Sequence, residues 1–174
     1  MVEPTTLVTG RLILRPARLA DADFMFERAS DPEFGRFLPL PQPYTRRDAE
    51  SFLASIVLRS WDTNPSFIIT REGEPVGDVN IRIDATHRTA EMGWGMHPRF
   101  WGQGLTTEAA RAVMDWAFDT FGLAKVLARC DAGNIGSWRV MEKLGMAREG
   151  RLRAHRLLRG ERRDEFIYGA LCGR

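Results

Sequence analysis

A loop with two glycines, residues 99–107, stands directly before the strongest helical pattern of the chain and constrains the fold more than any other segment. In the helix predicted over residues 105–121, charged residues recur every three or four positions and the opposite face is apolar. Gly122 stands where a helix C-cap belongs. Gly102 and Gly104 let backbone amides approach a ligand closely, and a helix start offers unpaired N–H groups with a positive dipole end. We therefore expect an anion to bind at this loop.

Strand-like and helical patterns alternate along the rest of the chain, which predicts a mixed α/β fold in one domain, residues 1–174. Strands are expected over residues 11–15, 66–70, 75–83, 89–96 and 125–130, and on both sides of a turn at Gly160. Helices are expected over residues 19–28, 48–61, 105–121 and 135–144. Short polar turns join the three strands between residues 66 and 96 and predict an antiparallel meander. Residues 32–43 contain four prolines, so we expect no regular helix there but a flexible segment that faces the substrate.

Composition excludes several classes of protein. The formal net charge of +2 is too small to imply nucleic-acid binding without a localised basic patch. No apolar run approaches the roughly 18 residues of a membrane helix, and the first residues lack the pattern of a secretory signal, so neither membrane insertion nor secretion is expected. Two cysteines, Cys130 and Cys172, exclude a disulfide scaffold and a four-cysteine zinc site. We expect no metal and a reducing, cytoplasmic location.

The loop matches neither familiar phosphate motif, because no Lys-Ser/Thr pair follows its second glycine and a third glycine is missing. The order of motifs is more informative: a strand, Arg-x-x-Gly-x-Gly, a helix, a strand, Asn-Ile-Gly-Ser at 134–137, a helix, and Lys-Leu-Gly-Met at 143–146. This order resembles the GNAT superfamily of N-acetyltransferases over nearly the whole chain. Residues 98–104 and 149–153 resemble its RimJ/RimL branch, which acetylates N-terminal amines of ribosomal proteins and includes relatives that act on small amines.

The resemblance implies the acyl-CoA N-acyltransferase fold, a largely antiparallel sheet that is flanked by helices and splayed at the cofactor site. Acetyl-CoA is then the co-substrate: loop amides would wrap its pyrophosphate, and its pantetheine arm would lie between the strand that ends at residue 96 and the strand at residues 128–129. We expect the pairing to break at His97-Pro98, because proline cannot donate to a ladder. The expected cofactor contacts are Met96, Arg99, Phe100, Trp101, Gly102, Gln103, Gly104, Leu105, Thr106, Thr107, Asn134 and Ser137.

Within this set, Asn134 and Ser137 are assigned specific roles by the resemblance. It implies that the Asn134 amide contacts the pantetheine and that the Ser137 hydroxyl lies near the thioester sulfur, where charge develops as the thiolate leaves. A purely structural alternative is that either residue caps the following helix, for about 1 kcal/mol of stability.

Glu91 is the candidate general base. Strand alternation places it on one face with Gly93 and Gly95, whose missing side chains leave space for a cavity. The alternative is an exposed strand glutamate that pairs with Arg82 or Arg88. His155, on the last hairpin, is a competing base, because an unperturbed imidazole titrates near pH 6.5.

Two further features concern the acceptor. Trp94 is expected to line the cofactor or acceptor pocket, and His155 to contact the acceptor. Residues 148–163 hold seven arginines against two glutamates, which is typical of a solvated hairpin face. The alternative is that this segment steers an acidic acceptor or a ribosomal surface.

The sequence thus predicts an acetyl-CoA-dependent N-acetyltransferase that acts directly on a primary amine, foremost a protein N-terminal α-amine. One alternative is acetyl or succinyl transfer to a small-molecule amine, with arginines holding the extra carboxylate of a succinyl group. Another is a catalytically inactive acyl-CoA-binding module. The expected partners are acetyl-CoA and an amine acceptor, with a ribosomal or other protein N-terminus as the leading acceptor, and a homodimer is left open.

Overall fold

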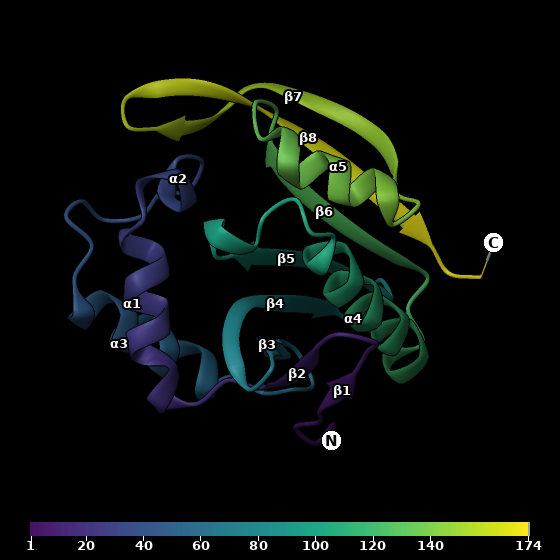
Figure 1. Cartoon of the computed structure of the whole chain (residues 1–174). Helices are drawn as coiled ribbons and strands as arrows, with labels where there is room; N and C mark the ends of the chain where they lie inside the picture. The colour runs from purple at the N-terminus through teal and green to yellow at the C-terminus, as the bar shows by residue number, and fades with distance from the viewer. Residues whose placement is uncertain (174) are drawn as a thin grey trace.

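An eight-stranded sheet with helices on both faces forms the frame of the computed structural model, which describes residues 1–173 (Figure 1). The strand order is β1-β2-β3-β4-β5-β6-β8-β7. Neighbouring strands are antiparallel except β5 and β6, which run parallel. The strands are β1 (Leu7–Val8), β2 (Ile13–Pro16), β3 (Ser66–Arg71), β4 (Glu74–Asp84), β5 (Thr89–Met96), β6 (Lys125–Asp131), β7 (Ala147–Leu158) and β8 (Glu161–Leu171). The mixed α/β fold and the meander β3-β4-β5 are confirmed.

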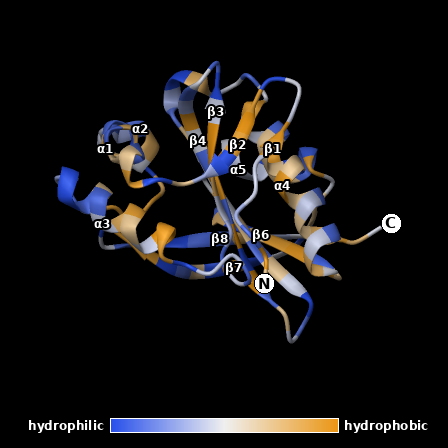
Figure 2. Ribbon diagram, turned by 90° about the horizontal axis from the view of Figure 1, so that it is seen from below, coloured by the Kyte–Doolittle hydropathy of each residue, from blue (hydrophilic) through white to orange (hydrophobic). Residues whose placement is uncertain are grey.

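Helices cover the two faces of the sheet unequally. The helices are η1 (Leu19–Asp21), α1 (Ala22–Ser30), α2 (Pro32–Gly35), α3 (Arg46–Val57), η2 (Pro98–Phe100), α4 (Leu105–Phe121) and α5 (Ile135–Lys143). The first group, α1 to α3, lies on one side of the sheet, and α4 and α5 lie on the other (Figures 1 and 2). Within the described residues, no helix is both long and apolar enough to cross a membrane.

The main core lies between the inner strands and α4. The buried residues that face one another there include Phe67, Val79, Ile81, Met92, Ala109 and Val113. Gly122 ends α4 in the left-handed conformation at φ 57°, so both the helix and its predicted C-cap are confirmed. A second, smaller cluster joins α1 and α3 to Ile68 of β3. Two apolar clusters therefore hold the helices to opposite faces of the same sheet.

The helix expected over residues 48–61 begins and ends earlier, as α3. Thr45 caps it: its hydroxyl accepts the Asp48 N–H at 3.3 Å, and the Asp48 carboxylate accepts the Thr45 N–H at 2.8 Å. The buried residues of α3 are Ala49, Leu53 and Ile56. Phe52 and Leu58, two apolar residues within the expected range, are exposed. The capping box, overlooked in the sequence, accounts for the earlier start.

The expectation of no regular helix within residues 32–43 is wrong at their beginning. Pro32 is the first residue of the short helix α2, where its fixed φ suits a helix and its missing N–H has no partner to lose. Asp31 caps this helix by accepting the Glu33 N–H at 2.9 Å.

Candidate active site

The parallel strands β5 and β6 separate after a short paired stretch. They pair only at Thr89–Lys125, Ala90–Val126 and Glu91–Leu127. Beyond this vertex β5 continues along β4 to Met96, about 17 Å at roughly 3.3 Å per residue, and β6 continues along β8. The predicted splay is confirmed, but it begins well before His97-Pro98. The proline is therefore not its cause, and the His97 N–H still bonds the Val76 carbonyl at 2.9 Å.

Backbone groups of β5 line one wall of this splay. In an antiparallel ladder, residues alternate between bonding the neighbour and pointing away from it. Since His97 bonds Val76 of the β4 side, the alternation directs the N–H and C=O groups of Met92, Trp94 and Met96 towards β6. Past the vertex β6 is no longer paired with β5, so the Met92 carbonyl, the N–H and C=O of Trp94 and the Met96 N–H can bond an extended ligand as an added strand would.

The loop after β5 is held by its own side chains. The Trp101 indole N–H donates to the Met96 carbonyl at 2.7 Å, which folds the loop back on the end of the strand. Gln103 joins two neighbours: its amide nitrogen donates to the Arg99 carbonyl at 3.3 Å, and its amide oxygen accepts from Arg71 at 2.9 Å. Trp101 and Gln103 thus have structural contacts in the loop, besides the cofactor contacts predicted for them.

Gly102 and Gly104 adopt the left-handed conformation, with φ of 75° and 77°. A Cβ placed on Gly102 would meet no atom within 4 Å, so the loop leaves open space in front of it. Gly104 is the N-cap of α4 and has no side chain with which to cap, so the first-turn N–H groups, including those of Thr106 and Thr107, are open to an anion. The loop and helix start fit the pyrophosphate of a CoA molecule.

Asn134 and Ser137 lie at the start of α5, beside β6. The Asn134 side-chain oxygen accepts the Ser137 N–H at 3.2 Å, so Asn134 is a helix cap. The Ser137 hydroxyl contacts the thiol of Cys130, which burial keeps almost entirely protonated by raising its pKa to about 11. Ser137 therefore points at Cys130, near the C-terminal end of β6. Because the Cys130 thiol stays protonated, it does not provide a thiolate that could attack a substrate.

Glu91 lies at the vertex of the splay, bound by two guanidinium groups. Arg82 donates to it at 2.6 Å, and Arg129 donates twice, at 3.0 and 2.7 Å. Burial alone would raise the pKa of Glu91, but Arg129 and then Arg82 hold that pKa below its usual value. Of the two partners expected from the sequence, Arg82 does bind Glu91, whereas Arg88 donates to the Gly122 carbonyl at 2.8 Å.

The two faces of β5 carry different groups. Trp94 shares its face with Met92 and Met96, which are buried under α4. The Trp94 side chain thus lies on the α4 face of the sheet, away from α1 to α3. Its role in acceptor binding stays a prediction. Gly93 and Gly95 lie on the face towards α1, and a Cβ on Gly95 would come within 3.1 Å of both Arg28 and Phe34.

A buried ion pair supports that face of β5. Arg28 of α1 pairs with Asp78 of β4 and also donates to the Gly95 carbonyl at 3.0 Å. The Arg28 guanidinium stacks on Phe34, 4.5 Å from the ring centroid. Sequence analysis missed Arg28, Phe34 and Asp78, because no local pattern predicts a contact between α1 and β4.

α2 and the two residues that follow it span the splay from β5 to β6. Phe34 lies against Gly95 of β5, and Phe37 lies near Gly133, just after β6. Arg159, at the tip of the β7–β8 hairpin, donates to the carbonyls of Gly35, Arg36 and Leu38 at 2.9, 3.1 and 3.3 Å. Figure 1 shows the hairpin reaching over α2. On its α1–α3 side, the splay is thus closed at one end by two aromatic rings and a hairpin tip.

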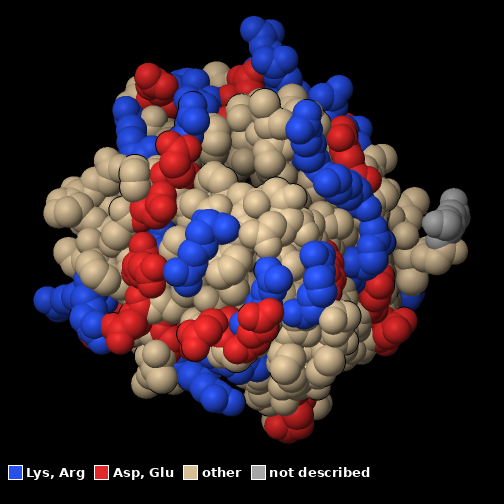
Figure 3. All heavy atoms as spheres, viewed as in Figure 1, with Lys and Arg blue, Asp and Glu red and all other residues tan. Residues whose placement is uncertain are grey.

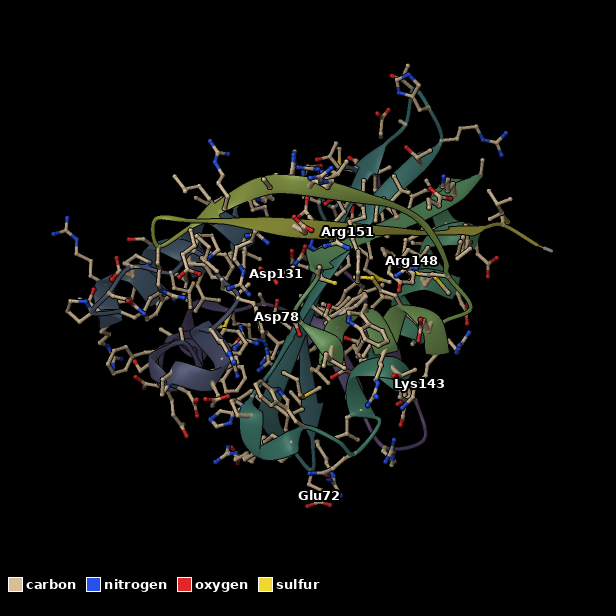
Figure 4. All side chains as sticks on the ribbon, turned by 90° about the horizontal axis from the view of Figure 1, so that it is seen from above. Glu72, Asp78, Asp131, Lys143, Arg148 and Arg151 are labelled. Carbon is tan, nitrogen blue, oxygen red and sulfur yellow. The ribbon has the colours of Figure 1, made fainter. Side chains whose placement is uncertain are left out.

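Most of the hairpin arginines form ion pairs or hydrogen bonds within the protein. Arg163 binds the buried Asp131 at 2.9 and 3.2 Å, and Arg151 binds Asp164 at 2.6 Å. Asp131 lies in the interior (Figure 4). His155 lies 3.6 Å from the buried carboxylate of Glu165, on the face that carries Asp131. His155 is on the hairpin and not beside the loop of residues 99–107, so its role as base or acceptor contact stays a prediction.

Comparison with known proteins identifies the family. Residues 11–147 match the acetyltransferase (GNAT) domain. An uncharacterised N-acetyltransferase of Bacillus subtilis, YnaD, is 29% identical over 95% of this chain and 96% of its own. The structure is similar to that of a GNAT-family acetyltransferase from Bacillus anthracis, with a TM-score of 0.85, 28% identity and coverage of 96% and 98% of the two chains.

A ribosomal L7/L12 α-N-protein acetyltransferase, RimL, solved with coenzyme A, has the same fold, with a TM-score of 0.88 at 19% identity over 96% of this chain and 98% of that chain. The split sheet and the glycine loop before α4 agree with the match to the acetyltransferase (GNAT) domain, and that match identifies the protein as an acyltransferase. The chain belongs to the GNAT acetyltransferase family, whose members use acetyl-CoA, and it is an enzyme of the N-acetyltransferase type.

Proposed function

We propose that this enzyme acetylates the α-amine of a protein or peptide N-terminus. The observation that carries this proposal is the state of Glu91, the carboxylate at the vertex. Two arginines keep its pKa low, so it is ionised at neutral pH but a weak base. A weak base suits an acceptor that is already partly neutral. At pH 7.4 an α-amine of pKa near 7.8 is roughly one quarter neutral, but a lysine amine near 10.4 only about 0.1%.

The residues of this chain divide the work between the two faces of the sheet. The backbone groups of Met92 and Trp94 would hold the pantetheine arm, and the amides from Gly102 onward the pyrophosphate. When bound, acetyl-CoA supplies the activated acetyl group. Glu91 would take the proton released by the attacking amine, and the Ser137 hydroxyl would donate to the departing sulfur.

The acceptor approaches on the face that carries Gly93 and Gly95, between the end of α3 and the wall formed by Phe34 and Phe37. Positioning an amine there against the thioester makes the transfer effectively intramolecular. The leading acceptor remains a ribosomal or other protein N-terminus. The reducing cytoplasm suits the buried thiol of Cys130 and the exposed thiol of Cys172.

The test compares three acceptors at pH 7.4 with acetyl-CoA in excess: a peptide with a free N-terminus and no lysine, the same peptide N-acetylated with one internal lysine, and a simple diamine. We expect the free N-terminus to react fastest, measured as kcat/KM by release of CoA. Equal or faster reaction of the lysine peptide or the diamine would contradict the proposal.

A further inference from the structure

A cavity of about 220 Å³ opens on the α1–α3 side of the sheet, directly beside the vertex of the splay. Gly93 of β5 and Asn80 of β4 form part of its wall, and Arg59, just past the end of α3, forms another part. Because Gly93 has no side chain, the cavity lies immediately next to the stretch of β5 that leaves β6. A group of the acceptor other than the reacting amine can therefore occupy it.

The charge of this cavity is strongly biased. Three guanidinium groups line it, those of Arg59, Arg82 and Arg129, against the single carboxylate of Glu91. Glu91 uses one nitrogen of Arg82 and two of Arg129. The remaining nitrogens of these two side chains have no bond to Glu91, and Arg59 makes no side-chain hydrogen bond or ion pair with any described residue.

Glu91 also orients the two guanidiniums that it binds. A bidentate contact fixes the plane of Arg129, and the third contact anchors Arg82 on the same carboxylate. Planar guanidiniums with free donors match the oxygens of a carboxylate or phosphate. The negative charge of Glu91 balances only one of the three arginines, so an added anion leaves the lining neutral or positive.

We propose that this cavity is a subsite for an anionic group of the acceptor, a carboxylate or phosphate carried close to the reacting amine. It rests on the proposed function, because the amine must enter on this face. The preferred acceptor is then an α-amine whose neighbouring residue is acidic, while uncharged and basic neighbours are disfavoured. Arg59 and Arg82 are specificity-determining residues of the subsite.

The experiment uses two peptides that differ by a single charge, Ala-Asp amide and Ala-Asn amide. Both have the same α-amine and no terminal carboxylate, so a change in the base or in the acetyl-CoA site cancels from the ratio of their kcat/KM values. We expect the Asp peptide to be favoured about tenfold, the size of one or two charge-assisted hydrogen bonds. Arg59→Gln and Arg82→Gln should each reduce this ratio to about 3 or less.

Arg162→Gln is the matched control, because Arg162 is exposed on the hairpin and its loss lowers the net charge equally. The ratio should stay unchanged in that variant, and a fall equal to that of Arg59→Gln would mean long-range attraction and overturn the subsite. Equal acetylation of both peptides by the native enzyme would also overturn it, while the proposed function would stand.

Calorimetric titration of both peptides into the enzyme with CoA separates the remaining cases. If neither peptide is acetylated but the Asp peptide binds at least fivefold more tightly, and Arg59→Gln removes the difference, the subsite stands and the proposed function fails. If neither is acetylated and both bind equally, or neither binds, the subsite is refuted as well.

Discussion

Two side chains beside the splay, Glu91 at its vertex and Ser137 next to Cys130 of β6, carry roles that differ from those of the residues around them. Glu91 belongs to a three-membered cluster with Arg82 and Arg129, so its charge has both a structural and a chemical use. Ser137 stands beside Asn134, whose side chain caps α5. Variants of neighbouring residues can therefore separate catalysis from stability.

Replacing Glu91 by Gln should affect stability and rate with different pH dependences. Since arginines lower the folded pKa of Glu91, its ionisation stabilises the fold above the unfolded pKa of about 4.3, and this contribution is lost as pH falls through the folded pKa. The variant should thus be less stable at pH 7, by about 1 kcal/mol or less for such a partly exposed cluster, and equally stable at strongly acidic pH. Urea titrations at both pH values measure this.

The rate of the same variant tests the role of Glu91 as base. We expect kcat/KM to fall about a hundredfold at neutral pH and to recover in part at high pH, where the amine arrives neutral. A variant that keeps its rate while His155→Ala loses it would move the base to the hairpin.

Ser137→Ala and Asn134→Ala form a second contrast. Loss of the cap in Asn134→Ala should cost about 1 kcal/mol of stability and leave the turnover of folded enzyme near normal. Ser137→Ala should lower kcat with little change in the KM for acetyl-CoA, because its contact strengthens only as charge develops on sulfur. Steady-state kinetics measures the change in kcat, and thermal melts measure the change in stability. An unchanged kcat in Ser137→Ala would leave Ser137 without a catalytic role.

Among the elements, the loop and the start of α4 form a unit that depends on glycine. Replacing Gly104 by Val has two effects. A β-branched residue at φ 77° is strained, and its side chain would obstruct the amides that face a phosphate. We expect Gly104→Val to reduce the affinity for CoA more than tenfold by calorimetry while melting stays cooperative.

Gly145, which follows α5, supplies the control for that variant. It has φ 81° and open space around it, so Gly145→Val carries a similar backbone strain away from the loop. It should lose stability but keep its affinity for CoA. Equal loss of affinity in both variants would mean that strain alone, and not the cradle, explains the effect.

At the scale of the whole molecule, the split of the sheet leaves the second half of β5 hydrogen-bonded to β4 alone. Its odd-numbered residues bond β4 along the full strand, whereas the backbone groups of Trp94 face the splay. Amide exchange should therefore be fast at Trp94 and slow at Gly93 in the free enzyme, and CoA should slow it at Trp94. Site-resolved hydrogen exchange checks this, and a Trp94 amide that CoA leaves unprotected would contradict an added-strand mode of binding.

Surface charge over the whole molecule gives no uniform field. On the face shown in Figure 3, basic and acidic side chains are interspersed, as the net charge of +2 suggests. The hairpin arginines illustrate the reason, because Arg151 and Arg163 pair with Asp164 and Asp131. Charge selectivity therefore has to come from a local site, such as the cavity lined by Arg59, Arg82 and Arg129.

The sequence by itself determined the elements that depend on neighbours along the chain. Helix α4, its glycine cap, strand β5 and the glycine loop follow from periodicity and backbone freedom, and their order indicated the family. Gly102 and Gly104 were predictable because positive φ is a local property of the backbone.

Only the tertiary structure decided which side chains meet across the sheet. Arg129 binds Glu91 because the parallel register sets Leu127 opposite Glu91, and that register depends on a crossover through α4. Arg159 reaches α2 across more than a hundred residues of chain, for the same kind of reason. Such contacts arise from the packing of distant segments, so no spacing in the sequence encodes them.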